Sequence, residues 1–503
     1  MMLCKGFTGA IKGIDAELIT VEVQADRGVG YHLVGMPDRA VRESQYRIAA
    51  ALKSCGLKMM VKRMTINLTP ADIRKQGTGF DLPIALGILQ SFGQLITDQL
   101  SRFMIVGALS LDGSILPVPG TLSMAKCAMH HGLKGIIVPW ENIQEASLVE
   151  GIEVYGAKHL SQITSFLLGG TWLKPAKPHK IRQSNRRIIE VDLSQIRGQM
   201  AAKRVLEISS VGNHHVLMMG PPGVGKTLLA KSITGILPKM SDQEIQEVTQ
   251  VYSSRINQVF GIPNLQRPFR QPHHHCTNAG MLGGGNPMSP GEASLAHRGV
   301  LYLDELPEFK KGVLQGLKLP LESKKIILAR GSYHLELPAS FSLIASMNPS
   351  PFRATGETES NNQVNREEYR DKSYRTKISK PLLDRIPLQI DIPKLSQEDL
   401  LEAPMGPSSS AVLERIEKSC EFRKMRLAQV GNQSTTWWQH VERHREIKSF
   451  WVHYMTQKKY SIRTQAMLYE VSRTIADLEL QDCVSLEHIF EALQYRSLDG
   501  YFE

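Results

Sequence analysis

Residues 220–227 read Gly220-Pro221-Pro222-Gly223-Val224-Gly225-Lys226-Thr227, and this octapeptide decides the fold class of the chain. It follows an apolar run, His215 to Met219, and precedes a helix-like stretch from Lys226 to Ile236. A glycine-rich loop between a strand and a helix is the context of a phosphate-binding P-loop. Its glycines let backbone N–H groups point at phosphate oxygens, and the start of the helix adds positive dipole there.

Two residues of this loop carry side-chain chemistry. In a P-loop the lysine reaches the β- and γ-phosphates of ATP, and the hydroxyl that follows it holds Mg²⁺. We therefore expect residues 220–227 to bind ATP, Lys226 to contact its phosphates and Thr227 to be a Mg²⁺ ligand.

An acidic pair, Asp304-Glu305, follows the apolar run Val300 to Leu303. In P-loop enzymes the first carboxylate after such a strand holds Mg²⁺, and the next one can orient and deprotonate the attacking water. The pair predicts Asp304 as a second Mg²⁺ ligand and Glu305 as the base. The alternative is a solvated strand end.

Three residues farther along the chain are candidates to complete the site. Asn348 ends the next apolar strand, where its amide could bind the attacking water or the γ-phosphate, or it is a turn residue before Pro349. Arg385 could stabilise transition-state charge on the nucleotide of a neighbouring subunit; the alternative is an ion pair with Asp384. Arg463 begins a helix-like run that could close over the γ-phosphate, although alone it is one basic residue among many.

The first 170 residues alternate strand-like and helix-like runs. Strands are expected at 18–23 and 64–68, and helices at 39–55 and 82–92. This alternation indicates an α+β or α/β domain.

Beyond residue 170 the pattern changes twice. Residues 171–190 hold six basic residues and two prolines and indicate an exposed basic linker. Strands alternate with helices over 191–393, which favours a parallel, doubly wound sheet. Residues 394–503 show helical periodicity and no strand signal after a Pro- and Ser-rich break, so we expect a small helical lid.

Composition sets broad limits. The 503 residues are 42% hydrophobic and carry a net charge of +11, of which +5 lies in 171–190 and +6 in 191–393. A basic middle suits a phosphate-backbone partner such as DNA, although it also serves solubility. No apolar run is long enough to span a bilayer. The N-terminus lacks the order of a signal peptide, so we expect a cytoplasmic protein with no membrane partner.

Two further groups have alternative interpretations. His273-His274-His275-Cys276 suggests a zinc site, but four consecutive residues cannot all point at one ion, so a loop that leads into Gly283-Gly284-Gly285 is the preferred interpretation. Trp437, Trp438 and Trp451 could stack on nucleic-acid bases, but at helical spacing tryptophans more often belong to a core.

Two segments, Pro272-His-His-His-Cys-Thr-Asn-Ala-Gly-Met-Leu-Gly-Gly-Gly285 and Pro290-Gly-Glu-Ala-Ser-Leu-Ala-His-Arg-Gly-Val-Leu-Tyr-Leu-Asp-Glu-Leu-Pro-Glu-Phe309, resemble the magnesium-chelatase-related branch of AAA+ ATPases. More narrowly, the chain is similar to the YifB/ComM family. Gly77 to Pro83, Pro381 to Arg385 and Arg473 to Leu478 extend the resemblance over essentially the whole chain.

The resemblance implies an α/β multidomain chain. Residues 1–170 would form a Lon-protease-like domain of the S5 domain 2-like type, 191–393 a P-loop AAA+ αβα sandwich and 394–503 the helical lid. Lon-type peptidases need a serine and a lysine, and our alignment places these near Gly79 and Leu122, which cannot do that chemistry. We therefore expect a non-catalytic assembly or DNA-contacting module there.

The resemblance also implies roles for residues already named. Asn348 would be a sensor, Arg385 a finger acting in trans, and Arg463 the lid sensor. A finger acting in trans requires a homo-oligomeric ring, and the family implies a hexamer. ComM-type proteins imply a motor for DNA branch migration during natural transformation. Two alternatives remain open: a chelatase-type motor subunit and a regulatory ATPase that remodels proteins.

Overall fold

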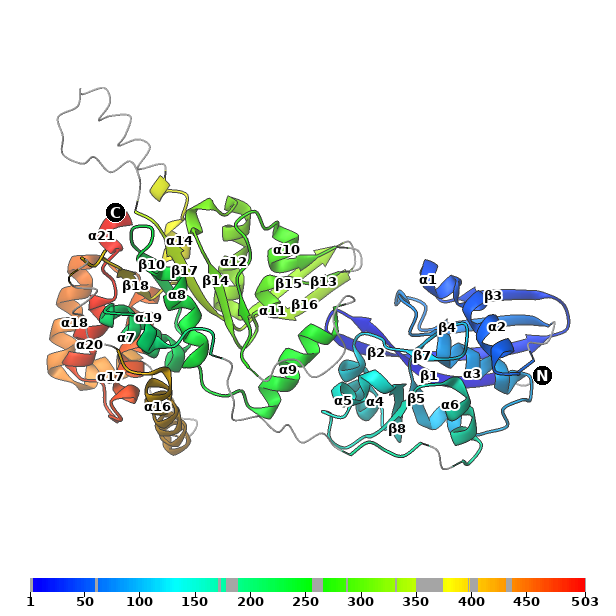
Figure 1. Cartoon of the computed structure of the whole chain (residues 1–503). Helices are drawn as coiled ribbons and strands as arrows, with labels where there is room; N and C mark the ends of the chain where they lie inside the picture. Colours follow the sequence, from blue (N-terminus) through cyan, green and yellow to red (C-terminus); the bar gives the residue numbers. More distant parts are fainter. Residues whose placement is uncertain are drawn as a thin grey trace, which may run out of the picture.

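The computed structural model describes residues 3–58, 62–170, 173–177, 189–255, 266–285, 288–330, 333–349, 374–396, 398, 406–430 and 437–502. Figure 1 shows a mixed sheet with its helices at one end of the molecule, a parallel sheet in the middle and a helical C-terminal part at the other end. The expected combination of a mixed α/β fold, a parallel sheet and a helical C-terminus is confirmed.

The N-terminal sheet has the strand order β3-β4-β2-β1-β5-β8-β9. Its strands are β1 (Leu3–Lys12), β2 (Asp15–Asp26), β3 (Gly30–Val34), β4 (Arg63–Thr69), β5 (Phe103–Ile105), β8 (Gly135–Pro139) and β9 (Glu153–Ala157). The β1·β2 and β2·β4 pairs are antiparallel, and the remaining pairs are parallel. Ile19, Val21 and Val23 are buried in alternation along β2, as the two-residue period of a strand requires.

Helices cover both faces of this sheet, because neighbouring residues of one strand enter different cores. Phe103 and Ile105 of β5 pack in one core, and Met104 packs in the other. The helices are α1 (Arg39–Arg42), α2 (Ser44–Ser54), α3 (Asp81–Ser91), α4 (Thr121–His130), α5 (Ile143–Ala146) and α6 (Leu160–Leu167), and a short β6–β7 pair (Ala108–Leu109, Ile115–Leu116) lies beside them. The single helix expected over 39–55 is two helices, α1 and α2, joined at Glu43.

The central sheet is parallel throughout, with the order β11-β14-β17-β10-β18. Its strands are β11 (Phe269–Arg270), β14 (Val300–Leu303), β17 (Ser342–Met347), β10 (Val216–Met219) and β18 (Leu388–Asp391). β17 therefore lies between β10 and β14, so the loops after these three strands meet at one sheet edge. Ligands of open α/β sheets bind at this edge.

Helices also cover both faces of the central sheet. Leu217 and Met219 pack on one side, and Val216 and Met218 pack on the other. The helices are α7 (Met200–Gly212), α8 (Lys226–Ser232), α9 (Asp242–Ser253), α10 (Asn278–Leu282), α11 (Glu292–Leu295), α12 (Lys311–Ser323) and α14 (Lys380–Leu383). Two hairpins, β12–β13 (Gly283–Gly284, Ser289–Pro290) and β15–β16 (Lys325–Arg330, Tyr333–Pro338), complete this part. The α-helix expected to reach Ile236 ends at Ser232, and a 3-10 turn continues it to Gly235.

The C-terminal part is helical in its described residues. It comprises α16 (Ser409–Val430), α17 (Trp437–Arg443), α18 (Arg445–Lys458), α19 (Ile462–Leu478), α20 (Leu486–Gln494) and α21 (Asp499–Phe502). Val471 and Ile475 of α19 pack in the same core as Val205 and Leu206 of α7, which attaches these helices to the central sheet. Among the residues that the structure describes, no helix is both long and apolar enough to cross a membrane.

Helix α9 lies between the central and N-terminal parts (Figure 1). Gln246 Nε2 donates to the carbonyl of Leu148 at 2.8 Å, and Gln250 Nε2 donates to Asp15 Oδ1 at 2.8 Å. Glu244 and Glu247 of the same helix form ion pairs with Arg298 of the central part. The two faces of α9 thus hold different parts of the chain.

Candidate functional site

The phosphate loop joins β10 to α8, and its glycines meet two different requirements. Gly223 and Gly225 have φ of +83° and +91°, in the left-handed region that favours glycine, and a Cβ on either would find no atom within 4 Å. A Cβ on Gly220 would lie 2.5 Å from the carbonyl oxygen of Ile392, just after β18. Backbone conformation therefore requires Gly223 and Gly225, whereas close packing against the end of β18 requires Gly220.

Lys226 is the buried cation of the loop. It is 8% exposed, and its Nζ donates to the carbonyls of Gly220 at 2.6 Å and Pro221 at 2.9 Å. Nζ also donates to Asn348 Oδ1 at 2.9 Å. Burial lowers the pKa of Lys226, and the carboxylates of Asp304 and Glu305 oppose that shift. The structure thus places Asn348 directly beside the phosphate-loop lysine.

Thr227 and Asp304 face each other across the sheet edge. Thr227 Oγ1 donates to Asp304 Oδ2 at 3.2 Å, and Ser346 Oγ donates to Asp304 Oδ1. Tyr302 Oη lies 3.3 Å from Thr227 Oγ1 and 3.1 Å from Ser346 Oγ. Three hydroxyl side chains, one each from α8, β14 and β17, therefore form one polar network around the Asp304 carboxylate.

Sequence reasoning missed Tyr302 and Ser346. Tyr302 is wholly buried, and burial raises its pKa to about 12, so its hydroxyl stays protonated as a donor. Tyr302 is the one hydroxyl-bearing residue of β14, and Ser346 is one of two serines in β17. A hydroxyl group within an otherwise buried strand that ends at the site was the sequence signal that could have identified them.

Glu305 follows Asp304 with its backbone in the left-handed region, at φ 53° and ψ 55°. Its side chain is 51% exposed, and Oε2 lies 4.0 Å from Nδ1 of His274. Both residues line a cavity of about 630 Å³ beside the phosphate loop. The remaining lining residues of that cavity are Pro221, Pro222, Glu308, Asn348, Pro349 and Tyr374.

The donor set at this sheet edge suits a nucleotide with Mg²⁺. A hydroxyl and a carboxylate supply the oxygen ligands that Mg²⁺ prefers, and Lys226 supplies the positive charge that phosphates need. The open space around Gly223 and Gly225 leaves room for phosphate against the backbone. Thr227 and Asp304 would hold the ion.

The histidine run lies beside this cavity. Nitrogen atoms of His273, His274 and His275 lie within 4.8 Å of one another. Three of the four consecutive residues therefore come close together, although the sequence analysis expected that all four could not point at one ion. His273 and His275 are exposed, and Nδ1 of His273 accepts the backbone N–H of His275 at 3.3 Å. The contact with Glu305 ties this loop to the nucleotide site.

The two candidate arginines lie together. Arg385 donates to Glu322 Oε2 at 2.9 Å, and an Nη atom of Arg463 lies 3.1 Å from Glu322 Oε1. The alternative of an Arg385–Asp384 ion pair is therefore wrong for the described chain, because Glu322 of α12 is the partner. Within the described ranges, neither arginine forms a hydrogen bond or ion pair with the phosphate loop of its own chain.

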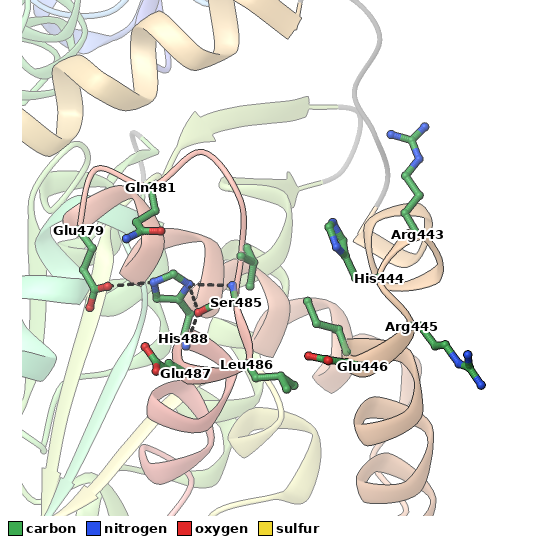
Figure 2. Close-up of a pocket in the computed structure, with 12 residues that line it drawn as sticks. Arg443, His444, Arg445, Glu446, Glu479, Gln481, Ser485, Leu486, Glu487 and His488 are labelled. Carbon is green, nitrogen blue, oxygen red and sulfur yellow. Dashed lines mark hydrogen bonds and ion pairs between the residues drawn. The ribbon is translucent and has the colours of Figure 1, made fainter.

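A concavity of about 670 Å³ lies among the C-terminal helices. Figure 2 shows His488 between Glu479 and Ser485, while Arg443 and Arg445 point away from the histidine. His488 Nδ1 accepts the N–H of Ser485 at 2.9 Å, and Nε2 lies 3.0 Å from Glu479 Oε2. The bond with Ser485 belongs to the capping box at the start of α20, so His488 serves the helix end.

The tryptophans divide between core and surface. Trp451 is 3% exposed and its indole N–H donates to Gln465, and Trp437 packs on the same cluster. Trp438 is 50% exposed. The core interpretation is thus confirmed for Trp451 and Trp437, whereas Trp438 lies at the surface.

Three family models match successive parts of the chain. The model described as "Magnesium chelatase, subunit ChlI" matches residues 192–400. "Subunit ChlI of Mg-chelatase" matches residues 21–142, and "Magnesium chelatase, subunit ChlI C-terminal" matches residues 406–496.

Two similar proteins align with nearly the whole chain, and a third aligns with about a quarter of it. Competence protein ComM of Haemophilus influenzae is 38% identical, over 99% of this chain and 98% of its own length. Uncharacterized protein YifB of Escherichia coli is also 38% identical, over 98% of this chain and 96% of its own. Lon protease 2 of Bacillus subtilis is 26% identical over 143 residues, which are 27% of this chain and 25% of that protein.

Proposed function

The chain belongs to the ComM/YifB family of magnesium-chelatase-related AAA+ ATPases, and from this membership we propose that it is a ring-forming motor that hydrolyses ATP to move DNA. The family implies nucleotide and Mg²⁺ use. The site supports the proposal because Lys226, Asn348 and Asp304 come from the segments that follow β10, β17 and β14 and meet at one sheet edge.

Each residue of the site has a proposed role. Lys226 binds the β- and γ-phosphates, and the backbone of residues 220–225 cradles them. Thr227 and Asp304 hold Mg²⁺, which when bound neutralises charge on the phosphates. Glu305 orients the attacking water and takes its proton, and the Asn348 amide positions that water or the γ-phosphate.

Arg385 would act on the nucleotide of the next subunit. Its contacts in the described chain are with Glu322 and the carbonyl of Pro381, away from its own phosphate loop. Arg463 shares Glu322 with it, so we assign both arginines to the same neighbouring nucleotide. Under this proposal the lid sensor acts beside the finger, which requires a homo-oligomeric ring, and we propose that the ring is a hexamer.

The single observation that carries the DNA assignment is the 38% identity to a competence protein over nearly the full length of both chains. The aligned part includes the N-terminal region and residues 171–393, where most of the net positive charge lies. We propose ATP-driven branch migration in recombination during natural transformation.

Branch migration of a synthetic four-way junction tests this proposal. The native protein is expected to separate the junction arms only with ATP and Mg²⁺, and Glu305→Gln should abolish this while keeping nucleotide binding. Glu414→Gln, an exposed carboxylate paired with Lys418 in α16, is the matched control and should act like the native protein. If the native protein moves no branched DNA, the DNA assignment is wrong.

A chelatase-type motor is the second candidate, because the descriptions of the matching family models name magnesium chelatase. The two candidates differ in what stimulates hydrolysis. Branched DNA should raise the ATPase rate of a DNA motor, whereas a porphyrin-binding partner should raise that of a chelatase motor.

A further inference from the structure

Glu322 is the residue that brings the two arginines together. Its Oε2 accepts Nη2 of Arg385 at 2.9 Å, and its Oε1 lies 3.1 Å from Nη2 of Arg463. Each carboxylate oxygen thus holds a different guanidinium. The side chain of Arg385 is 16% exposed, whereas those of Arg463 and Glu322 are 37% and 49% exposed.

The three side chains come from three separate elements. Glu322 lies in the last turn of α12, Arg385 follows α14, and Arg463 is the second residue of α19. α12 and α14 belong to the central part, and α19 belongs to the C-terminal helices. One carboxylate therefore links the position of the helical lid to that of an arginine in the central part.

Electrostatics explains why a carboxylate is needed here. Two guanidinium groups repel each other at close range, and a shared carboxylate offsets that repulsion while fixing both side chains by charge-assisted hydrogen bonds. Arg385 first, and then Arg463, lower the pKa of the Glu322 carboxyl, so it is ionised at neutral pH. Nε of Arg385 is buried without a hydrogen-bond partner in the described part of the chain.

We propose that Glu322 is a positioning residue that sets Arg385 and Arg463 as one unit toward the nucleotide of the neighbouring subunit. The inference rests on the proposed function, in which Arg385 acts in trans. Without the carboxylate the guanidiniums separate and regain rotamer freedom, so the ATPase site of the next subunit loses aligned charge. Misplacement of a positioned group by about 1 Å costs on the order of a hundredfold in rate.

Glu322→Gln is the direct test. The amide keeps the shape of the side chain but loses its charge and one of its two acceptor oxygens. We expect kcat for ATP hydrolysis to fall by about tenfold to a hundredfold, with nucleotide affinity nearly unchanged, because the phosphate loop of the same subunit is intact. Glu414→Gln is the control, and circular dichroism with a thermal midpoint checks that each variant folds. Native kcat in a folded Glu322→Gln protein would overturn the inference.

Mixing subunits separates positioning in trans from a structural role. A Glu322→Gln subunit keeps its phosphate loop, and a Lys226→Ala subunit keeps both arginines and Glu322. Where a Lys226→Ala subunit serves a Glu322→Gln subunit, the interface is complete. Random assembly forms this pairing at about a quarter of the interfaces of an equal mixture, so the mixture should reach about a quarter of the native rate, above the rate of either impaired protein alone. Glu305→Gln mixed with Lys226→Ala should recover nothing, because both changes impair the same side of the interface.

The Arg385→Ala and Lys226→Ala mixture tells the two proposals apart. If that mixture also fails to recover activity, the assignment of Arg385 in trans is wrong. If it recovers but the Glu322→Gln mixture does not, the role of Glu322 is wrong. Should Glu322→Gln not fold, the same mixing with Glu322→Asp applies, since the shorter carboxylate keeps its charge but reaches less far.

Discussion

His214 is enclosed between the central sheet and the C-terminal helices. It precedes β10, and its Nε2 lies 2.8 Å from Thr474 Oγ1 of α19. Its carbonyl accepts the hydroxyls of Ser209 and Ser342 at 2.7 and 3.0 Å. One buried histidine therefore joins the start of β10, the strand that leads into the phosphate loop, to α19, the helix whose second residue is Arg463.

The pKa of His214 predicts acid sensitivity of the fold. Burial lowers that pKa to about 3, and Arg423 and His215 add repulsion. An unfolded histidine has a pKa of about 6.5, so between these values the unfolded chain binds a proton that the folded chain does not. Stability is thus kept above about pH 6.5 and lost as the pH falls, by about 2 kcal/mol at pH 5.

Thermal unfolding of the full chain measures this loss. The fall in midpoint between pH 7.5 and pH 5 should be smaller for His214→Gln than for the native protein, because glutamine does not titrate. His453→Gln, at an exposed position of α18, is the matched control. Equal falls for His214→Gln and the native protein would contradict the prediction.

At the scale of elements, α9 holds the N-terminal part against the central part, a role that no pattern in its sequence indicates. Gln250 Nε2 donates to the carbonyl of Ile14 at 3.0 Å and to Asp15 Oδ1, and its Oε1 accepts Nζ of Lys126 at 2.9 Å. Ser253 adds hydrogen bonds to Gly120. A glutamine 7% exposed thus satisfies both its amide groups across the boundary between two sheets.

Gln250→Ala should loosen the N-terminal part from α9. It leaves a carbonyl, a carboxylate and the half-buried amine of Lys126 without this partner, at a cost of about 1–3 kcal/mol for each group that stays buried. Hydrogen exchange in α4 and α9 is expected to speed up, while exchange in β10 and β17 stays slow. Gln243→Ala in the same helix is the control, since among the described residues the Gln243 side chain bonds only to Glu247 of α9. Unchanged exchange in α4 would show that the contact does not hold the two parts.

At the scale of the whole molecule, the densest net positive charge, +5 over twenty residues, lies in 171–190, between the two sheets in the sequence. The predicted basic linker, residues 171–190, has Lys174 and Lys177 exposed in the structure, whereas Lys180, Arg182, Arg186 and Arg187 lie outside the described residues. The linker and its DNA contact therefore stay a prediction.

Replacing those six basic residues with glutamine should flatten the salt dependence of DNA binding. Every phosphate that the protein no longer neutralises reduces the steepness of log K against log salt by about 0.9 on duplex DNA. A fluorescence titration at several salt concentrations measures the slope. The control replaces six exposed basic residues of the C-terminal helices, namely Lys418, Lys424, Arg443, Arg445, Lys448 and Lys458. An unchanged slope in the linker variant would make it a tether only.

The sequence by itself determined the phosphate loop, the parallel sheet and the helical C-terminus. Short-range rules are enough for these, because Gly223 and Gly225 reveal a backbone requirement and strand periodicity reveals burial. The same rules placed Asp304 and Asn348 at strand ends, and strand order then brought them to Lys226 and Thr227.

Only the tertiary structure decided which distant side chains share a partner. Tyr302 and Ser346 join the Asp304 network because β14 and β17 are neighbours, and Arg463 meets Arg385 because α19 packs where α12 ends. Neither Glu322 nor Gln250 belongs to any motif of the sequence. Their roles depend on what lies across from each helix, and that is fixed by packing between segments far apart in the chain, which no local pattern records.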